Sequence, residues 1–342
     1  MSEIAGTVDW VIRPYYDGDI PRITAALNAA LAADGLDIVY SPDEMRSELS
    51  GPNFDPHKHS VLVEGPPIEG LPDGMLAGFG WVKHIDDREA SERIYDVVLG
   101  THPSTRKLGL ERVIAGRLVE IARDNEQSPG KERMDTIRIR ASISAKSKSL
   151  ARLYESLGME QTRQFWIMLC PLDDLEEPQP VEGISIRNYR LPEDNRASLE
   201  AYNNSFADHY GSHPSTEERW NHRLSRPSFR PDLSWVAEIE GEPGKLAGFC
   251  ICAIFDEQNK SLGRRWGWVD LLGTVRGWRR KGLGRSLLLH GLRSLKSAGM
   301  DTAGLGVDSK NLTGANRLYE SVGFYNYSLR LRFECDLEEV KA

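Results

Sequence analysis

The chain has 342 residues, of which 40% are hydrophobic and 27% charged, and its formal net charge at pH 7 is −8. This profile is typical of a globular protein of two ordinary domains, and it excludes collagen-like, coiled-coil and disordered chains. Lys and Arg number 43 against 51 Asp and Glu, which argues against a general nucleic-acid-binding protein.

The sequence carries no membrane or export signal. No apolar run reaches the ~18–20 residues that cross a bilayer, and the first six residues lack the basic and apolar regions of a secretory signal. The four cysteines contain no Cys-x-x-Cys pair, which suits a reducing compartment. We therefore expect a cytoplasmic protein without membrane contact.

The two halves of the chain repeat the same motifs in the same order. The repeated segments are Ile12–Tyr15 with Ile186–Tyr189, Leu76–Phe79 with Leu246–Phe249, Arg106–Leu110 with Arg279–Leu283, Asp135–Thr136 with Asp301–Thr302, and Arg152–Gly158 with Arg317–Gly323. Five ordered matches indicate a duplicated domain. The acidic, Pro-rich stretch between the two halves is typical of a linker. We therefore expect domains over 1–172 and 184–342 with a linker over 173–183.

Strand-like and helix-like segments alternate in each half, which indicates an α/β fold. In the first half, the polar stretch 125–132 is longer than its counterpart and predicts an exposed insertion. The second half gives the clearer series: strands over 234–239, 246–252, 266–274 and 302–307, and helices over 282–298 and 313–322.

The segment Leu272–Arg285 joins a strand to a helix through a basic, Gly-containing turn. Gly282 and Gly284 allow a ligand to approach the backbone, and the N–H groups and dipole of a helix start favour an anion. The cationic side chains around the turn are Arg279, Arg280, Lys281 and Arg285. The pattern fits a pyrophosphate site, and the alternative is a Gly-containing turn with a solvated basic face.

A second motif follows about thirty residues later, with Asp308–Asn311 and then Ala315–Phe324. An Arg-x-x-Gly-x-Gly turn followed by Asn…Ala-Asn-x-x-Tyr-x-x-x-Gly-Phe resembles the GNAT family of acetyl-CoA-dependent N-acetyltransferases. The resemblance covers nearly the whole chain, once per half. It implies an α/β fold of two tandem GNAT-like domains, each a mixed, mostly antiparallel sheet flanked by helices.

The resemblance also implies roles for individual residues, with acetyl-CoA as cosubstrate. The turn Arg279, Arg280, Lys281, Gly282, Leu283, Gly284 and Arg285 would hold the pyrophosphate. Backbone groups of Leu272, Thr274 and Val275 would hold the pantetheine, and Asn311 and Asn316 would complete the coenzyme site. Tyr319 would be the general acid beside the thioester sulfur. The alternative for Tyr319 is an ordinary core tyrosine.

The acceptor amine requires a group that removes a proton, because an alkyl ammonium with a pKa near ~10 is not nucleophilic. Asp270 is the candidate base, as the carboxylate on the strand that leads to the turn and on the face of Leu272. The alternative is an ion pair with Arg264 or Arg265. His209, His213 and His222 are further candidates, and no His/Cys group has the spacing of metal ligands.

The first half departs from the motif. Glu111 stands where Gly284 stands, Lys146 where Asn311 stands, and Ala151 where Asn316 stands, although Tyr154 is retained. This half is therefore either a structural domain with a degenerate coenzyme site or a domain that binds acyl-CoA without turnover.

The sequence as a whole predicts an N-acetyltransferase that uses its C-terminal domain to acetylate a primary amine of a small molecule. The alternatives are an acetyltransferase that acts on a protein amine and a non-catalytic acyl-CoA-binding module.

Overall fold

The computed structural model describes residues 9–66, 68–208, 213–311 and 314–341. The chain forms two compact units, unit 1 from Met1–Arg163 with Arg330–Ala342 and unit 2 from Gln164–Leu329. Within the described ranges, no helix is long and apolar enough to cross a membrane.

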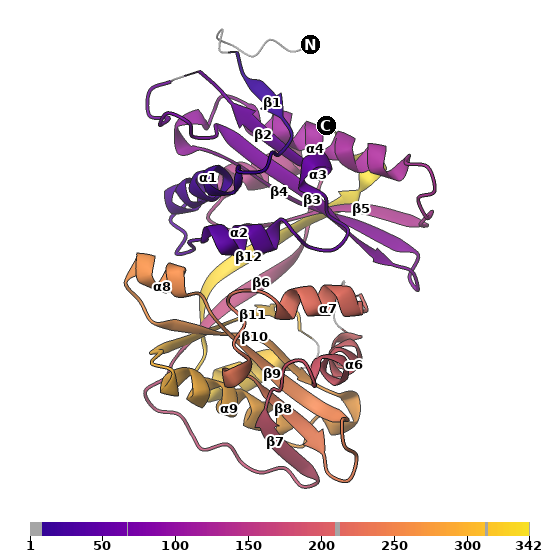
Figure 1. Cartoon of the computed structure of the whole chain (residues 1–342), viewed down its shortest axis with the longest axis vertical. Coiled ribbons are helices and arrows are strands. Elements are labelled where there is room, and N and C mark those ends of the chain that lie inside the picture. Colours follow the sequence, from indigo (N-terminus) through magenta and orange to yellow (C-terminus); the bar gives the residue numbers. More distant parts are fainter. Residues whose placement is uncertain (1–8, 67, 209–212, 312–313, 342) are drawn as a thin grey trace. The chain divides into compact units, whose positions relative to one another are not determined.

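In the described residues of unit 1, helices cover both faces of the sheet strands (Figure 1). Its elements are β1 (Val11–Arg13), α1 (Ile20–Ala33), α2 (Pro42–Glu48), α3 (Pro56–His59), β2 (Ser60–Glu64), β3 (Gly78–Asp87), β4 (Glu92–Thr101), α4 (Leu110–Glu126), β5 (Thr136–Ser144), α5 (Lys148–Ser156) and the end of β12 (Tyr325–Asp336). The strand order is β1-β2-β3-β4-β5-β12, and among the described residues of this unit β4 and β5 pair in parallel while the other neighbours are antiparallel. One core packs against α1 and α2, and the other against α4 and α5.

Unit 2 has the same plan. Its elements are β6 (Glu160–Pro171), β7 (Ile184–Asn188), α6 (Asn195–Phe206), α7 (Glu217–Leu224), β8 (Trp235–Ile239), β9 (Leu246–Ile254), α8 (Asp256–Leu262), β10 (Trp266–Thr274), α9 (Leu283–Ser297), β11 (Thr302–Asp308) and α10 (Ala315–Val322). The order is β7-β8-β9-β10-β11-β6, again with one parallel pair, β10 and β11. The expected fold of mixed, mostly antiparallel sheets flanked by helices is confirmed.

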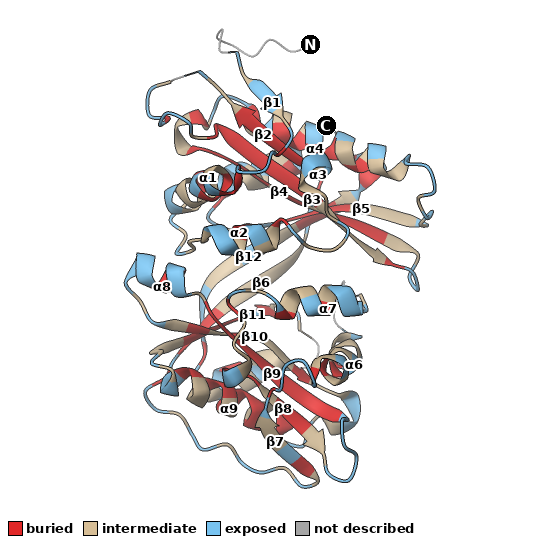
Figure 2. Ribbon diagram, in the orientation of Figure 1, coloured by how far each residue is buried: buried red, intermediate tan, exposed pale blue. Residues whose placement is uncertain are grey.

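The cores follow the apolar pattern of the sequence. Every residue of β9 is buried, because helices cover both of its faces (Figure 2). The leucines of α9 that recur at helical spacing, Leu288, Leu292 and Leu295, are fully buried against the sheet. The helix ends before Gly299, which adopts the left-handed φ of 87° that glycine tolerates without strain.

The compact units differ from the expected domain boundaries, because each unit takes its last strand from the other half of the sequence. Residues 165–171 of β6 pair with β11 in unit 2, and residues 330–336 of β12 pair with β5 in unit 1. The physical reason is that strand partners are chosen by long-range packing, which a local repeat pattern does not encode.

The expected linker 173–183 is an ordered part of unit 2. Leu175 and Val181 pack against its core, and α9 donates hydrogen bonds to the linker backbone, from Ser286 Oγ to the Gln179 carbonyl at 2.7 Å and from Lys296 Nζ to the Asp173 carbonyl at 2.7 Å. The linker is therefore fixed along one helix.

In the stretch 125–132, residues 127–130 and 132 are exposed as expected, while Glu126 and Lys131 contact the rest of unit 1. The first residues of the stretch complete α4, and the Glu126 carboxylate accepts hydrogen bonds from the buried guanidinium of Arg93 at 2.9 and 3.0 Å. Lys131 lies against His84 on β3, with 3.1 Å between Nζ and Nε2. Glu126 and Lys131 thus anchor an otherwise exposed stretch to a partly buried polar cluster.

Candidate active site

The site is centred where β10 and β11 separate in unit 2. Their parallel pairing covers only Trp266–Trp268 and Thr302–Gly304, although β10 continues to Thr274 and β11 to Asp308. In unit 1, β4 and β5 stay paired over six residues, Glu92–Val97 with Thr136–Ala141. Unit 2 therefore opens a longer gap between its two parallel strands.

A β-bulge marks the start of this gap. The register between β10 and β9 shifts between Val269 and Leu271, which leaves Asp270 as the extra residue, whereas β3 and β4 pair without a shift. Leu271 then packs toward α6 and α7, while Leu272 packs toward α9. The expectation that Asp270 and Leu272 share a face is wrong, because the bulge breaks the two-residue alternation of the strand.

The turn after β10 presents a bare helix start. Gly282 precedes α9 with a left-handed φ of 82° and no side-chain cap, and the first helical hydrogen bond runs from the Ser286 N–H to the Gly282 carbonyl. A Cβ on Gly284 would lie 3.3 Å from Thr274 Oγ1. The N–H groups of the first turn and the cradle at Gly284 form a position suited to an anion.

The four basic side chains of the turn do not act alike. Arg279 and Arg285 are held by protein groups, the former near the end of α6 and the latter by Ser321 on α10 and Glu176. Arg280 and Lys281 are exposed, with the Lys281 ammonium over the Trp278 ring at 4.4 Å. The side chains of Arg280 and Lys281 are thus the more accessible cations.

The backbone groups expected to hold the pantetheine are partly used within the fold. The Val275 N–H donates to the Ala247 carbonyl at 2.9 Å, and its carbonyl accepts from the Trp278 N–H at 2.8 Å. The Thr274 carbonyl accepts from Arg279 Nε at 3.2 Å. Leu272 pairs with β9 on one side only, so its other edge faces the gap between β10 and β11.

The second motif brings Tyr319 and Asn316 onto α10. Tyr319 is buried in the α9 core, and this burial raises the pKa of its hydroxyl, so the phenol stays protonated. Asn316 Oδ1 is buried without a hydrogen-bond partner among the described residues. A buried acceptor of this kind requires a donor, which a bound ligand can supply. Asn311 lies in the loop after β11, where its N–H donates to the Asp308 carbonyl at 3.1 Å.

Asp270 forms an ion pair, but not with the partners expected from the sequence. Its carboxylate lies 2.9 Å from Arg223 Nη1 of α7, whereas Arg264 lies over the Trp266 ring and Arg265 pairs with Asp301. No sequence signal singled out Arg223, because α7 and β10 are far apart along the chain. Of the candidate histidines, His209 lies outside the described residues.

The matching position in unit 1 is filled by the protein itself. Glu111, at the start of α4, accepts a hydrogen bond from Thr101 Oγ1 at 2.6 Å, and Thr101 ends β4 as Thr274 ends β10. Lys146 Nζ donates to the Gly35 carbonyl at 2.7 Å, which ties the loop after β5 to the end of α1. Glu111 thus has a carboxylate beside the strand end where unit 2 has only Gly284, and Lys146 bonds the neighbouring loop to Gly35 after α1.

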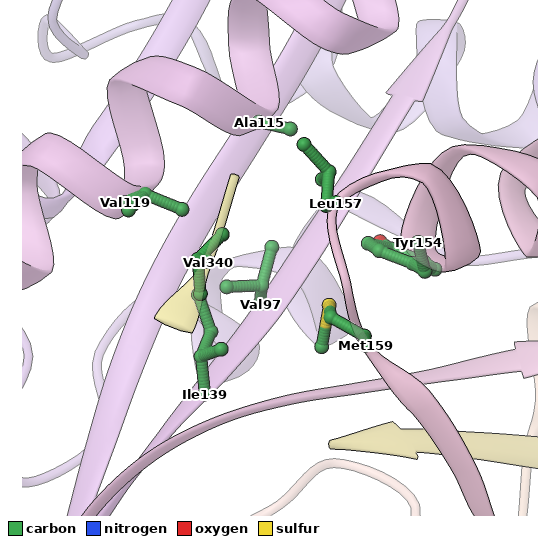
Figure 3. A pocket seen from close by; sticks show the side chains of 8 residues that line it. All are labelled: Val97, Ala115, Val119, Ile139, Tyr154, Leu157, Met159 and Val340. Atoms are coloured by element: carbon green, nitrogen blue, oxygen red, sulfur yellow. The ribbon is translucent and has the colours of Figure 1, made fainter. Parts of the chain in front are cut away.

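Tyr154 of unit 1 is a core residue. Its ring packs on Phe333 with 5.9 Å between centroids, and it borders a small apolar cavity of about 10 Å³ beneath α4 and α5 (Figure 3). The lining side chains are Val97, Ala115, Val119, Ile139, Tyr154, Leu157, Met159 and Val340. This cavity offers no polar partner besides the tyrosine, and it is too small for a substrate.

Unit 2 thus combines an uncapped helix start behind a glycine cradle, exposed cations, a gap between parallel strands and an orphaned amide oxygen. This combination on a mixed, mostly antiparallel sheet is the one expected of an acyl-CoA-dependent transferase of the GNAT type. The sequence of residues 196–324 matches the model of the acetyltransferase (GNAT) family.

Whole-chain comparisons give the same class. A mycothiol acetyltransferase of Thermobispora bispora is 30% identical over 92% of this chain and 96% of its own length. The crystal structure of a GCN5-related N-acetyltransferase from Sphaerobacter thermophilus superposes with a TM-score of 0.70 and 26% identity, covering 96% of each chain. A tandem GNAT protein from the clavulanic acid pathway shares the fold, with a TM-score of 0.68, 16% identity and coverage of 96% and 99%.

The chain therefore belongs to the GNAT family of acetyltransferases. It is an acyltransferase that transfers acetyl to an amine, with acetyl-CoA as cosubstrate, and the expected class of enzyme is confirmed.

Proposed function

We propose that unit 2 binds acetyl-CoA and acetylates a primary amine of a small molecule, while unit 1 binds no coenzyme. One observation carries the proposal. At the start of α9, which follows β10, unit 2 has Gly284 beside Thr274. At the start of α4, which follows β4, unit 1 has Glu111 bonded to Thr101. An anion fits the first position, whereas a carboxylate of the protein already occupies the second.

The chemistry follows from the groups around the gap. The amine attacks the thioester carbonyl directly, so the acetyl group passes to nitrogen and the coenzyme leaves as a thiolate. Asp270 is the candidate acceptor for the proton of the ammonium, directly or through a water molecule, with Arg223 fixing the carboxylate. The Tyr319 hydroxyl, kept protonated by burial, donates a hydrogen bond to the departing sulfur.

The choice of a small molecule over a protein amine rests on the relatives. Mycothiol acetyltransferases match nearly the whole length of this chain, and their names denote a small-molecule substrate. The proposal includes a cytoplasmic location, because acetyl-CoA is available there. The four free cysteines also suit this reducing compartment.

The test is a thiol-release assay with acetyl-CoA and two acceptor panels, one of small primary amines and one of peptides with lysine or a free α-amine. We expect release that depends on the small amines and is lost in the Gly284→Glu variant. Release that depends only on peptides would replace the small-molecule acceptor with a protein. Release unaffected by Gly284→Glu would move catalysis out of unit 2.

A further inference from the structure

The Arg279 guanidinium makes three contacts, all within unit 2. Nε donates to the Thr274 carbonyl at 3.2 Å, Nη2 donates to the Ser205 carbonyl at 2.8 Å, and Nη1 lies 3.1 Å from the Asp208 carboxylate. Each of the three guanidinium nitrogens therefore has an acceptor in the protein, and the side chain joins the end of β10 to the end of α6.

Asp208 binds a second arginine of the same turn. Its carboxylate accepts hydrogen bonds from both Nε and Nη2 of Arg276, the first at 3.0 Å. The Arg276 N–H donates to Asn204 Oδ1 at 3.1 Å, one turn earlier on α6. We call the contacts of Asp208 with Arg276 and Arg279 the Asp208 clasp.

Unit 1 contains the equivalent contact. Arg106, at the position of Arg279, lies 2.7 Å from the Asp34 carboxylate, and its Nη2 donates to the Ala30 carbonyl at 3.0 Å. Asp34 and Ala30 lie at the end of α1, as Asp208 and Ser205 lie at the end of α6. By the proposed function, Glu111 excludes a phosphate from this turn of unit 1, and Arg106 makes its contacts there all the same. The arrangement is thus a property of the turn and not of a ligand.

From this match we propose that Arg279 is a positioning residue: with Asp208 it fixes the turn to α6 and leaves the coenzyme phosphates to the N–H groups of α9 and to the exposed Arg280 and Lys281. This inference rests on the proposed coenzyme site of unit 2. It assigns to Asp208, which sequence reasoning did not single out, a part in holding the site.

The opposite charges of the pair provide the test. Arg279→Gln removes a positive charge beside the turn, and Asp208→Asn removes a negative one. If Arg279 bound phosphate, Asp208→Asn would free it and tighten acetyl-CoA binding, while Arg279→Gln would weaken it. If both residues position the turn, each variant weakens binding in the same direction, roughly three- to tenfold.

The measurement is calorimetric titration of the full-length protein with acetyl-CoA at several salt concentrations. We expect the double variant to lose no more affinity than the weaker of the two single variants, because both changes break the same contact between Asp208 and Arg279. The salt dependence of binding should stay near that of the wild type in Arg279→Gln and should fall in Lys281→Gln, since exposed charge contacts are the ones that salt screens. Arg106→Gln is the matched control and should leave binding unchanged.

Tighter binding by Asp208→Asn, or additive losses in the double variant, would overturn the positioning role. Loss of salt dependence in Arg279→Gln would overturn it as well. If the Gly284→Glu variant still binds acetyl-CoA like the wild type, the proposed coenzyme site of unit 2 is refuted. This result distinguishes failure of the proposed function from failure of the positioning role of Arg279.

Discussion

The two helix starts, at Leu110 in unit 1 and at Leu283 in unit 2, share one scaffold and differ at the ligand position. Each follows a glycine with a left-handed φ, 79° for Gly109 and 82° for Gly282. Each helix also holds its unit's last helix through an arginine and a serine, Arg112 Nη2 to Ser156 Oγ at 2.6 Å and Arg285 Nη1 to Ser321 Oγ at 2.7 Å. Because these contacts occur in both units, we infer that they stabilise the fold.

The difference lies in the residues that a ligand would touch. Unit 1 has a glutamate at the helix start, bonded to the end of β4, and keeps its parallel strands paired for longer, while unit 2 has a glycine, a bulge and an open gap. A residue of the turn that is matched in both units supports the fold, and a residue that differs is a candidate for function. The predictions below test this rule.

The largest effect concerns the division of the chain. A fragment of residues 164–329 contains all of unit 2, and we expect it to fold and to bind acetyl-CoA. A fragment of residues 184–342, cut at the boundary that the repeat suggests, lacks β6 with its buried Met168 and Cys170, and the buried Leu172 that follows this strand. Cooperative thermal unfolding and coenzyme titration measure the difference.

We expect no cooperative unfolding from the 184–342 fragment, because the loss of three buried apolar side chains costs about 2–5 kcal/mol each, against a total stability of ~5–15 kcal/mol. A 184–342 fragment that melts cooperatively and binds the coenzyme would show that the exchanged strands are dispensable.

The next effect concerns the two matched tyrosines. Tyr319→Phe removes the hydroxyl but keeps the ring in the core, so we expect kcat to fall about 100-fold, the low end for a general acid, because a thiolate with a pKa near ~8.5 leaves without much help. Coenzyme affinity and melting temperature should change little. Tyr154→Phe is the control and should leave turnover unchanged. If Tyr154→Phe greatly lowers turnover and Tyr319→Phe does not, catalysis belongs to unit 1.

Coenzyme affinity should follow the Gly284 and Glu111 positions. Gly284→Glu copies unit 1 into unit 2, and we expect acetyl-CoA affinity to fall at least ~10-fold, because a carboxylate would face the pyrophosphate and its Cβ would crowd Thr274. Titration of the wild type should find one tight site per chain. Two equal sites would contradict the difference between the units. Glu111→Gly need not create a site, since Lys146 still ties the loop to α1.

The bulge residue provides a smaller effect. Asp270 has no paired counterpart in unit 1, so it belongs to the residues that differ. We expect Asp270→Asn to lower the rate at saturating amine about tenfold and to remove the acidic limb of the pH–rate profile. Arg223→Gln is the companion variant, since it removes the ion-pair partner of Asp270 and keeps the Asp270 carboxylate. If Asp270→Asn keeps the wild-type pH–rate profile but melts at a lower temperature, Asp270 serves only as a structural ion-pair partner of Arg223.

The sequence predicted the elements of unit 2 well because their signals are local. The strand over 266–274 has the observed bounds, and Gly299 and Gly323 end helices as expected. The bulge, the Thr101–Glu111 contact and the strand exchange depend on residues brought together by folding. Asp208 is an exception, because it stands 174 residues after Asp34, within the offsets of the repeat, and a longer comparison of the halves would have found it.

The smallest effect concerns a buried polar cluster of unit 1, where His84 packs against Lys131 and beside Tyr95. Burial, with the nearby charge of Lys131, lowers the pKa of His84 to about 4. Because the unfolded chain binds this proton near pH ~6.5, the stabilisation is complete above that pH and is lost as the pH falls from about 6.5 toward about 4. At pH 5 the loss from this group amounts to about 2 kcal/mol.

We therefore expect chemical denaturation of His84→Asn to show a weaker fall in stability between pH 7 and pH 5 than the wild type, with turnover unchanged because the cluster lies in unit 1. If His84→Asn loses as much stability as the wild type between pH 7 and pH 5, the acid response belongs to other histidines such as His59, His102 and His290, whose pKa values burial also lowers.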